Sequence, residues 1–193
     1  MRILIADDEA IIRLGLKAEL EQMGHQVVAA ASDGIAAVEQ ARTTRPDLAI
    51  LDIKMPGLDG LDAAEAIAAD RPLPIVILSA YADRRLVERA ASLAVHGYLV
   101  KPVRPSEMEP ALEIAVSRFE EAEALRKEAH DLQEALRTRA TVDEAKRMLI
   151  KARGWREEEA FRRLQARARN ERRTMRQVAE ELLQGRLKPA DIS

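Results

Sequence analysis

The chain of 193 residues contains no cysteine, which excludes disulfide bridges and thiolate metal sites. Aromatic residues are scarce, with one tryptophan, two tyrosines and two phenylalanines, so any core must consist mainly of aliphatic side chains. The sequence also lacks an uncharged apolar stretch of about 20 residues, the length of a membrane-spanning helix, and a basic leader with an apolar signal core. We therefore expect a soluble, cytoplasmic protein that makes no membrane contact.

Five short apolar runs occupy the first hundred residues. They lie at residues 2–6, 26–30, 46–52, 74–79 and 97–101. Each is continuous in its apolar centre rather than alternating with polar residues, which indicates strands that are buried on both faces. The sequence therefore predicts a parallel five-stranded α/β sheet covered by helices.

Polar residues stand where four of these runs end. They are Asp7, Asp8, Asp52, Ser79 and Lys101. In an open parallel sheet, ligands bind outside the carboxyl ends of the strands, so these side chains should gather in one pocket. A single carboxylate at a strand end is more often a helix cap or a turn residue. Five polar residues of suitable types at four strand ends favour a functional site instead.

The residue types in this predicted pocket point to phosphoryl chemistry. Three neighbouring carboxylates repel one another unless a cation neutralises them, and oxygen ligands suit Mg²⁺. Lys101 can then pair with a phosphoryl oxygen, and the Ser79 hydroxyl can donate to another. We therefore interpret Asp52 as a carboxylate nucleophile that attacks phosphorus, with the metal and Lys101 offsetting the developing charge.

Residues 1–120 resemble a response-regulator receiver domain. The resemblance rests on Asp7-Asp8, on residues 51–60 (LDIKMPGLDG), on Ser79, and on Tyr98 followed by Lys101-Pro102. It implies a flavodoxin-like (βα)₅ fold and Mg²⁺-dependent phosphotransfer from a sensor histidine kinase to Asp52. It also implies metal ligation by Asp7, Asp8, Asp52 and the Lys54 backbone carbonyl, a conformational switch at Ser79 and Tyr98, and a usually cis Lys101-Pro102 bond.

Charge is distributed unevenly along the chain. Residues 1–117 carry 12 basic and 18 acidic side chains, whereas residues 138–193 carry 15 basic and 9 acidic side chains. A net charge of +6 at one end suggests a polyanionic partner, although a run of charge is often only a solvated helix face.

A long helix is predicted between the two ends, because neither glycine nor proline occurs from Ala111 to Arg153. Apolar residues recur within it at a spacing of three and four, at Ala122, Leu125, Ala129, Leu132 and Leu136. This pattern is typical of a short coiled coil or of a linker helix that packs on its own C-terminal domain. We assign residues 121–137 to this linker and hypothesise that the chain forms a homodimer on phosphorylation.

Three helices are predicted at the C-terminal end, one reaching Gly154, a second over residues 156–169 and a third over residues 174–183. Gly154 and Gly185 are suitable stops, and Thr174 with Gln177 forms a capping-box pattern. Short helices are marginal alone, so residues 138–193 should pack as a small all-α bundle.

This bundle resembles the ANTAR domain, an RNA-binding antitermination module. The residues that carry the resemblance are Ala135-Leu136, Arg139, 142–150 (VDEAKRMLI), 159–164 (EAFRRL), Ala168, 170–173 (NERR) and Val178-Ala179. Arg147 stands where the family usually has glycine. The resemblance implies binding of RNA hairpins that compete with a terminator stem, so that transcription continues.

Structured RNA is read mostly at loops, where bases stack on rings or guanidinium planes and phosphates meet Lys and Arg. The candidate contacts are Lys146, Arg147, Lys151, Arg172, Arg173 and Arg176. Trp155 is either a stacking ring or an apolar plug between helices, and Phe161 is predicted to lie in the core.

The function predicted from the sequence is that of a phosphorylation-dependent antiterminator, a regulator and not an enzyme. Two alternatives stay open. The bundle can instead dock a signalling protein as an adaptor, or it can bind DNA through a helix-turn-helix. The acidic Glu157-Glu158-Glu159 at the start of the second helix disfavours DNA.

Overall fold

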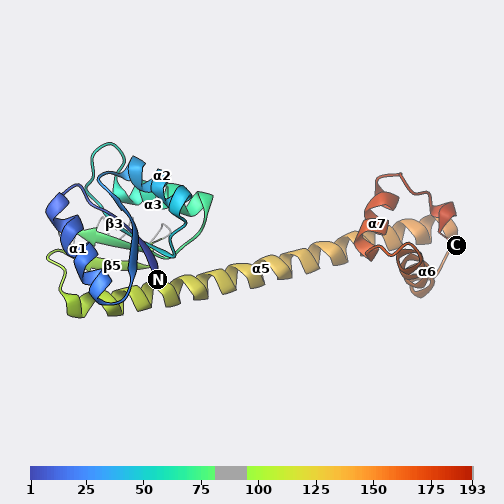
Figure 1. Cartoon of the computed structure of the whole chain (residues 1–193). Helices are drawn as coiled ribbons and strands as arrows, with labels where there is room; N and C mark the ends of the chain where they lie inside the picture. Colours follow the sequence, from blue (N-terminus) through green and yellow to red (C-terminus); the bar gives the residue numbers. More distant parts are fainter. Residues whose placement is uncertain (81–94, 193) are drawn as a thin grey trace. The chain divides into compact units, whose positions relative to one another are not determined.

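The computed structural model describes residues 1–80 and 95–192. The chain folds into two compact units, Met1–Ala124 and Leu125–Ser193. The boundary falls within α5, an uninterrupted helix of 49 residues from Pro105 to Arg153 (Figure 1). Among the described residues, no helix combines the length and hydropathy needed to cross a membrane.

The first unit contains the predicted five-stranded parallel sheet. Its strands are β1 (Arg2–Ala6), β2 (Gln26–Ala31), β3 (Leu48–Asp52), β4 (Ile75–Ser79) and β5 (Gly97–Val100), in the spatial order β2-β1-β3-β4-β5. Every residue of β3 and β4 is buried, as the continuous apolar runs predicted. This is the flavodoxin-like order, and it confirms the predicted fold.

Helices cover both faces of the sheet (Figure 1). Besides α5, they are α1 (Ala10–Gln22), α2 (Gly34–Thr44) and α3 (Gly60–Asp70). The side chains of α2 and α3 share one core with alternate strand residues, whereas α1 and the first turns of α5 share the core on the other face. The fourth helix of a (βα)₅ alternation would fall in residues 81–94, outside the described residues.

Gly60 sits where the loop after β3 passes closest to the end of that strand. A Cβ atom at Gly60 would overlap the backbone oxygen of Asp52, and backbone cannot rotate away as a flexible side chain can. Gly60 is the first residue of α3, and the amides of the next two residues, Leu61 and Asp62, donate to the Asp59 carboxylate at 2.9 and 2.8 Å. Glycine at position 60 therefore allows the chain to turn tightly beside Asp52.

Gly60→Ala is expected to lower the free energy of unfolding of the first unit by about 1–3 kcal/mol, because the added methyl group must push the loop away from Asp52. Gly15→Ala is the matched control, since nothing lies within 4 Å of a Cβ there, and in mid-helix it should stabilise by about 0.5–1 kcal/mol. Urea denaturation followed by circular dichroism measures both, while Trp155 fluorescence follows the second unit separately. Equal midpoints for the two variants would contradict the steric account.

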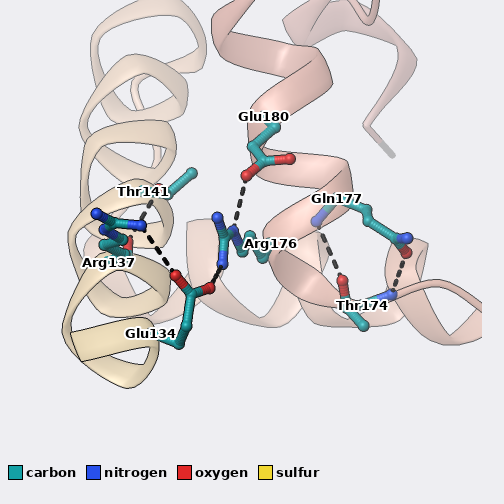
Figure 2. Close-up of polar contacts among 7 residues, drawn as sticks. All are labelled: Glu134, Arg137, Thr141, Thr174, Arg176, Gln177 and Glu180. Atoms are coloured by element: carbon teal, nitrogen blue, oxygen red, sulfur yellow. Dashed lines mark hydrogen bonds and ion pairs between the residues drawn. The ribbon is translucent and has the colours of Figure 1, made fainter. Parts of the chain in front are cut away.

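The second unit consists of the last turns of α5 with α6 (Glu157–Asn170) and α7 (Met175–Leu183). These are the three predicted helices, and the capping box of Thr174 and Gln177 is confirmed, with the reciprocal bonds drawn in Figure 2. Gly154, at φ 68°, lies directly after α5. The core contains Val142, Ala145, Leu149, Ala160, Leu164, Ala168, Val178, Ala179 and Leu182.

The last element of this bundle was not predicted from the sequence. After Gly185 the chain forms a short 3₁₀ helix, Pro189–Asp191, and both Leu187 and Ile192 are buried in the bundle core. The Arg167 guanidinium donates to the Asp191 backbone oxygen at 3.1 Å. The C-terminal segment therefore completes the bundle.

Candidate functional site

The predicted pocket forms at the carboxyl end of the sheet. Asp7 follows β1, Asp52 ends β3 and Lys101 follows β5. The Lys101 ammonium lies 2.6 Å from Asp7 Oδ2 and 3.0 Å from Asp52 Oδ1, so one cation bridges two carboxylates. Asp7 and Asp52 are almost completely buried, whereas Asp8 is exposed.

Backbone hydrogen bonds hold these strand ends in place. The Ile53 amide donates to the Leu78 carbonyl at 3.1 Å, and the Lys101 amide donates to the Ser79 carbonyl at 2.8 Å. The ladder thus continues past the ends of β3 and β5 on either side of β4. This backbone pairing brings Asp52, Ser79 and Lys101 together at the carboxyl end of the sheet.

The pocket holds more negative than positive charge. Burial raises the pKa of Asp52 above its ordinary value, and the charges of Asp7 and Asp8 add to this, although Lys101 acts in the opposite direction. Burial acts to lower the pKa of Lys101, but its hydrogen bonds to the two buried carboxylates outweigh burial and raise that pKa. Lys101 is therefore charged at neutral pH, and one further cation would relieve the remaining repulsion.

The carboxylates in this pocket fit a hard divalent cation. Asp7, Asp8 and Asp52 each offer one oxygen, and these oxygens lie within 4.8 Å of one another. Apart from its ion pair with Lys101, the buried Asp7 Oδ2 accepts no hydrogen bond from the described residues. This donor set is the type that Mg²⁺ prefers. The Lys54 carbonyl follows two residues after Asp52, and its role as a ligand stays a prediction.

The two predicted switch residues lie beside the pocket. Ser79 is buried at the end of β4, and Tyr98 is half-buried in β5 opposite Ile77. The Lys101-Pro102 peptide bond is cis. Residues 81–94, which follow Ala80, lie outside the described residues. The switch itself stays a prediction.

Three of the six predicted RNA contacts are engaged in ion pairs within the bundle. Lys146 bridges Asp143 (2.7 Å) and Glu157 (2.8 Å). The Arg173 guanidinium is 2.7 Å from Glu181 and 3.3 Å from Glu171. The ion pairs of Lys146 connect α5 with the start of α6. The ion pairs of Arg173 connect the turn before α7 with α7 itself.

Arg176 is the third of these cations and is drawn in Figure 2. It lies between Glu180, one turn along α7 at 2.7 Å, and Glu134 of α5. Arg137 reaches the same Glu134 carboxylate at 3.1 Å. Arg176 thus joins α7 to α5, which is a structural use that the sequence did not predict.

The other three predicted contacts, Arg147, Lys151 and Arg172, are exposed. No side-chain ion pair joins any of them to another residue in ranges 1–80 and 95–192. Arg147 and Lys151 are one turn apart on α5 and therefore share a face. These three cations are available to an anionic partner.

The two aromatic residues of the bundle differ in environment. Trp155 packs against the bundle core beneath the Arg153 and Arg163 guanidinium groups, at 5.0 and 5.6 Å from its ring, which agrees with an apolar plug. Phe161 was predicted to lie in the core, and this was wrong, because 40% of it is exposed. The buried stripe of α6 consists of Ala160, Leu164 and Ala168, and Phe161 lies beside it.

The predicted seam of the linker is apolar and uncovered. Leu125, Leu132 and Leu136 are 60–66% exposed on α5. Large aliphatic side chains at this spacing are expected to be buried by a partner.

Two family models match the chain. Residues 3–113 match the response regulator receiver domain, and residues 130–183 match the ANTAR domain. These matches agree with the acidic pocket of the first unit and the helical bundle of the second.

Similar proteins include one that matches along nearly the whole chain. The transcriptional regulatory protein PdtaR of Mycobacterium tuberculosis is 47% identical over 190 residues, which cover 98% of this chain and 93% of PdtaR. The chemotaxis protein CheY of Thermotoga maritima is 35% identical over 112 residues, covering 58% of this chain and 93% of CheY. A solved receiver domain of a modulated diguanylate cyclase from Desulfovibrio desulfuricans is 32% identical, with a TM-score of 0.57, and covers 61% of this chain and 94% of that domain.

Proposed function

The chain belongs to the response regulators that join a receiver domain to an ANTAR domain, and we propose that phosphorylation of Asp52 controls RNA-hairpin binding and thereby antitermination. Both domains are regulatory, so the chain is a transcriptional regulator and not an enzyme. The observation that carries the proposal is Lys101, held between Asp7 and Asp52, in a chain similar to PdtaR over both domains. We assign the receiver to residues 1–120, the linker to 121–137 and the RNA-binding domain to 138–193.

In the proposed reaction, a receiver aspartate takes a phosphoryl group from a phosphohistidine of a sensor kinase. An Asp52 carboxylate oxygen forms a bond to phosphorus as the donor P–N bond breaks, and the electron pair of that bond returns to the imidazole. Lys101 is already 3.0 Å from Asp52 Oδ1 and can pair with a phosphoryl oxygen. The Ser79 hydroxyl, at the adjacent strand end, is assigned to donate to another.

We assign Mg²⁺ to the carboxylates of Asp7, Asp8 and Asp52 and to the Lys54 carbonyl. The donor chemistry and the clustering of the three carboxylates, whose oxygens lie within 4.8 Å of one another, support this assignment. When bound, the ion supplies positive charge that offsets charge on the phosphoryl oxygens. The protein holds the carboxylates in register and keeps Lys101 charged beside them.

On the RNA side, we assign phosphate contacts to Arg147, Lys151 and Arg172. Their exposure and lack of ion pairs in the described structure support this choice. Lys146, Arg173 and Arg176 would have to break ion pairs to meet a phosphate, so we assign them mainly to shaping the bundle.

A binding panel tests the RNA assignment. The full chain, with and without phosphorylation, is titrated with a terminator-proximal RNA that carries two stem-loops and with a matched DNA duplex, over a salt series. RNA binding that weakens with salt supports the proposal, because released counterions drive phosphate contacts. Binding to DNA alone would favour a DNA-binding regulator, and absence of all nucleic-acid binding would favour a protein adaptor.

The uncovered seam of Leu125, Leu132 and Leu136 suggests how the phosphoryl signal is transmitted. We propose that phosphorylation favours a state in which two chains pair along this seam. Sedimentation velocity with beryllofluoride and Mg²⁺ should then show a dimer, and Leu132→Lys should prevent it while leaving phosphorylation intact. A change in shape at constant mass would indicate release of the bundle instead, and no change in either would reject both routes.

A further inference from the structure

An open groove of about 800 Å³ is formed by α5 and α6 in the second unit. It is lined by Lys146, Arg156, Glu157, Glu158, Phe161 and Arg162. Its volume falls within the range of about 300–1,000 Å³ that small organic ligands occupy. Arg156 and Arg162 are exposed and take part in no ion pair among the described residues.

The apolar part of the lining is the Phe161 ring. The bundle core does not contain this residue, and the buried stripe of α6 is complete without it. The Lys146 ammonium lies 6.0 Å from the ring centroid and is held there by Asp143 and Glu157. Two carboxylates thus hold the Lys146 ammonium over the Phe161 ring.

A second groove of about 380 Å³ lies next to the first, because Lys146 and Glu157 line both. Arg139 and Arg147 add two cations there, and Asp143 adds one carboxylate. Together the two grooves contain five basic and three acidic side chains. Basic side chains therefore line the groove that contains the exposed ring and the groove next to it, which suits a flat group carried on a polyanion.

We propose that the Phe161 ring is the platform on which one unpaired base of an RNA loop stacks. Arg162, in the same groove, and Arg147, in the neighbouring groove, meet the phosphates that flank this base. Stacking requires an exposed face of an aromatic ring, and RNA loops present bases that are already unstacked. The inference rests on the proposed RNA-binding function and names the place where that function reads a base.

The test begins with a hairpin pool of fixed stem and randomised loop, selected on the unchanged full-length chain. The affinity of the selected hairpin is then measured for Phe161→Leu, Phe161→Tyr and Ile114→Ala. Phe161→Leu keeps an apolar side chain but removes the ring, so it should bind about 5- to 150-fold more weakly. Phe161→Tyr should bind as the unchanged chain does, and so should the control Ile114→Ala, which truncates an exposed side chain of the first unit.

Abasic substitution locates the base. Removing the stacked loop base should weaken binding by the unchanged chain. The hairpin that lacks this base should then bind Phe161→Leu and the unchanged chain with the same affinity. Full affinity in Phe161→Leu, or losses that add at every loop position, would overturn the stacking assignment while leaving RNA binding in place. Failure to select any hairpin would instead reject the proposed function. Equal thermal unfolding of Phe161→Leu and the unchanged chain shows that the fold is intact.

Discussion

Asp52→Asn is expected to accept no phosphoryl group from acetyl phosphate and Mg²⁺, whereas the unchanged chain accepts one. Asparagine has the same shape but lacks the carboxylate oxygen that bonds to phosphorus. The loss should not come from unfolding. Because burial and the neighbouring carboxylates already disfavour the charged form of Asp52, a neutral side chain relieves the pocket of repulsion. Intact-mass spectrometry measures the added phosphoryl group directly.

The matched control for this variant is Asp70→Asn, an exposed carboxylate at the last residue of α3 that pairs with Arg42 and not with the pocket. It should be labelled as the unchanged chain is. Chelating Mg²⁺ with EDTA should remove labelling from the unchanged chain as well, because three carboxylates and one lysine leave the pocket with excess negative charge. Equal labelling of Asp52→Asn and the unchanged chain would remove Asp52 as the phosphoacceptor.

Replacing Arg147, Lys151 and Arg172 together with glutamine is expected to weaken RNA binding by about ten- to a hundred-fold at moderate salt. Each lost phosphate contact also removes a released counterion, so the plot of log affinity against log salt should become shallower by about 2–3. Fluorescence anisotropy with the stem-loop RNA over a salt series measures both quantities.

The control for that triple variant changes the same net charge in the first unit. Lys17, Arg42 and Arg104 are exposed cations there, and their replacement with glutamine should leave both affinity and salt slope nearly unchanged. If the two triple variants bind equally weakly, overall charge drives binding and the three C-terminal side chains are not a defined contact surface. If neither variant is weakened, the phosphates meet other residues.

Much of the first unit could be predicted because its signals are local. A strand buried on both faces must be apolar throughout, so β3 and β4 stand out without any knowledge of their neighbours. The backbone geometry of the parallel sheet then places Asp52, Ser79 and Lys101 together at its carboxyl end. The pocket followed from the fold, and the charges of its residues indicated its chemistry.

The second unit was less predictable because its important contacts join distant residues. Arg176 pairs with Glu134, which precedes it by 42 positions, and no local pattern marks that pair. Phe161 resembles a core residue because it follows Ala160, yet helix periodicity does not say where the edge of a buried stripe lies. Leu187 and Ile192 follow a glycine stop, so their return to the core could be seen only in the structure.

These two kinds of contact also divide the roles of the basic residues. Cations that pair across the bundle, such as Arg173 and Arg176, make the bundle rigid. Cations without ion pairs in the described structure, such as Arg147 and Lys151, give it a surface potential that phosphates can neutralise. The net charge of the segment alone does not distinguish these uses.

The most direct test of the account is the affinity of the full-length chain for a selected RNA hairpin, measured with and without beryllofluoride and Mg²⁺. If Asp52 controls RNA binding, the phosphoryl mimic should tighten binding by about 5- to 150-fold, the usual range of coupling between two sites, and Asp52→Asn should show no change. An affinity that the mimic does not alter, or that it alters equally in Asp52→Asn, would contradict the account.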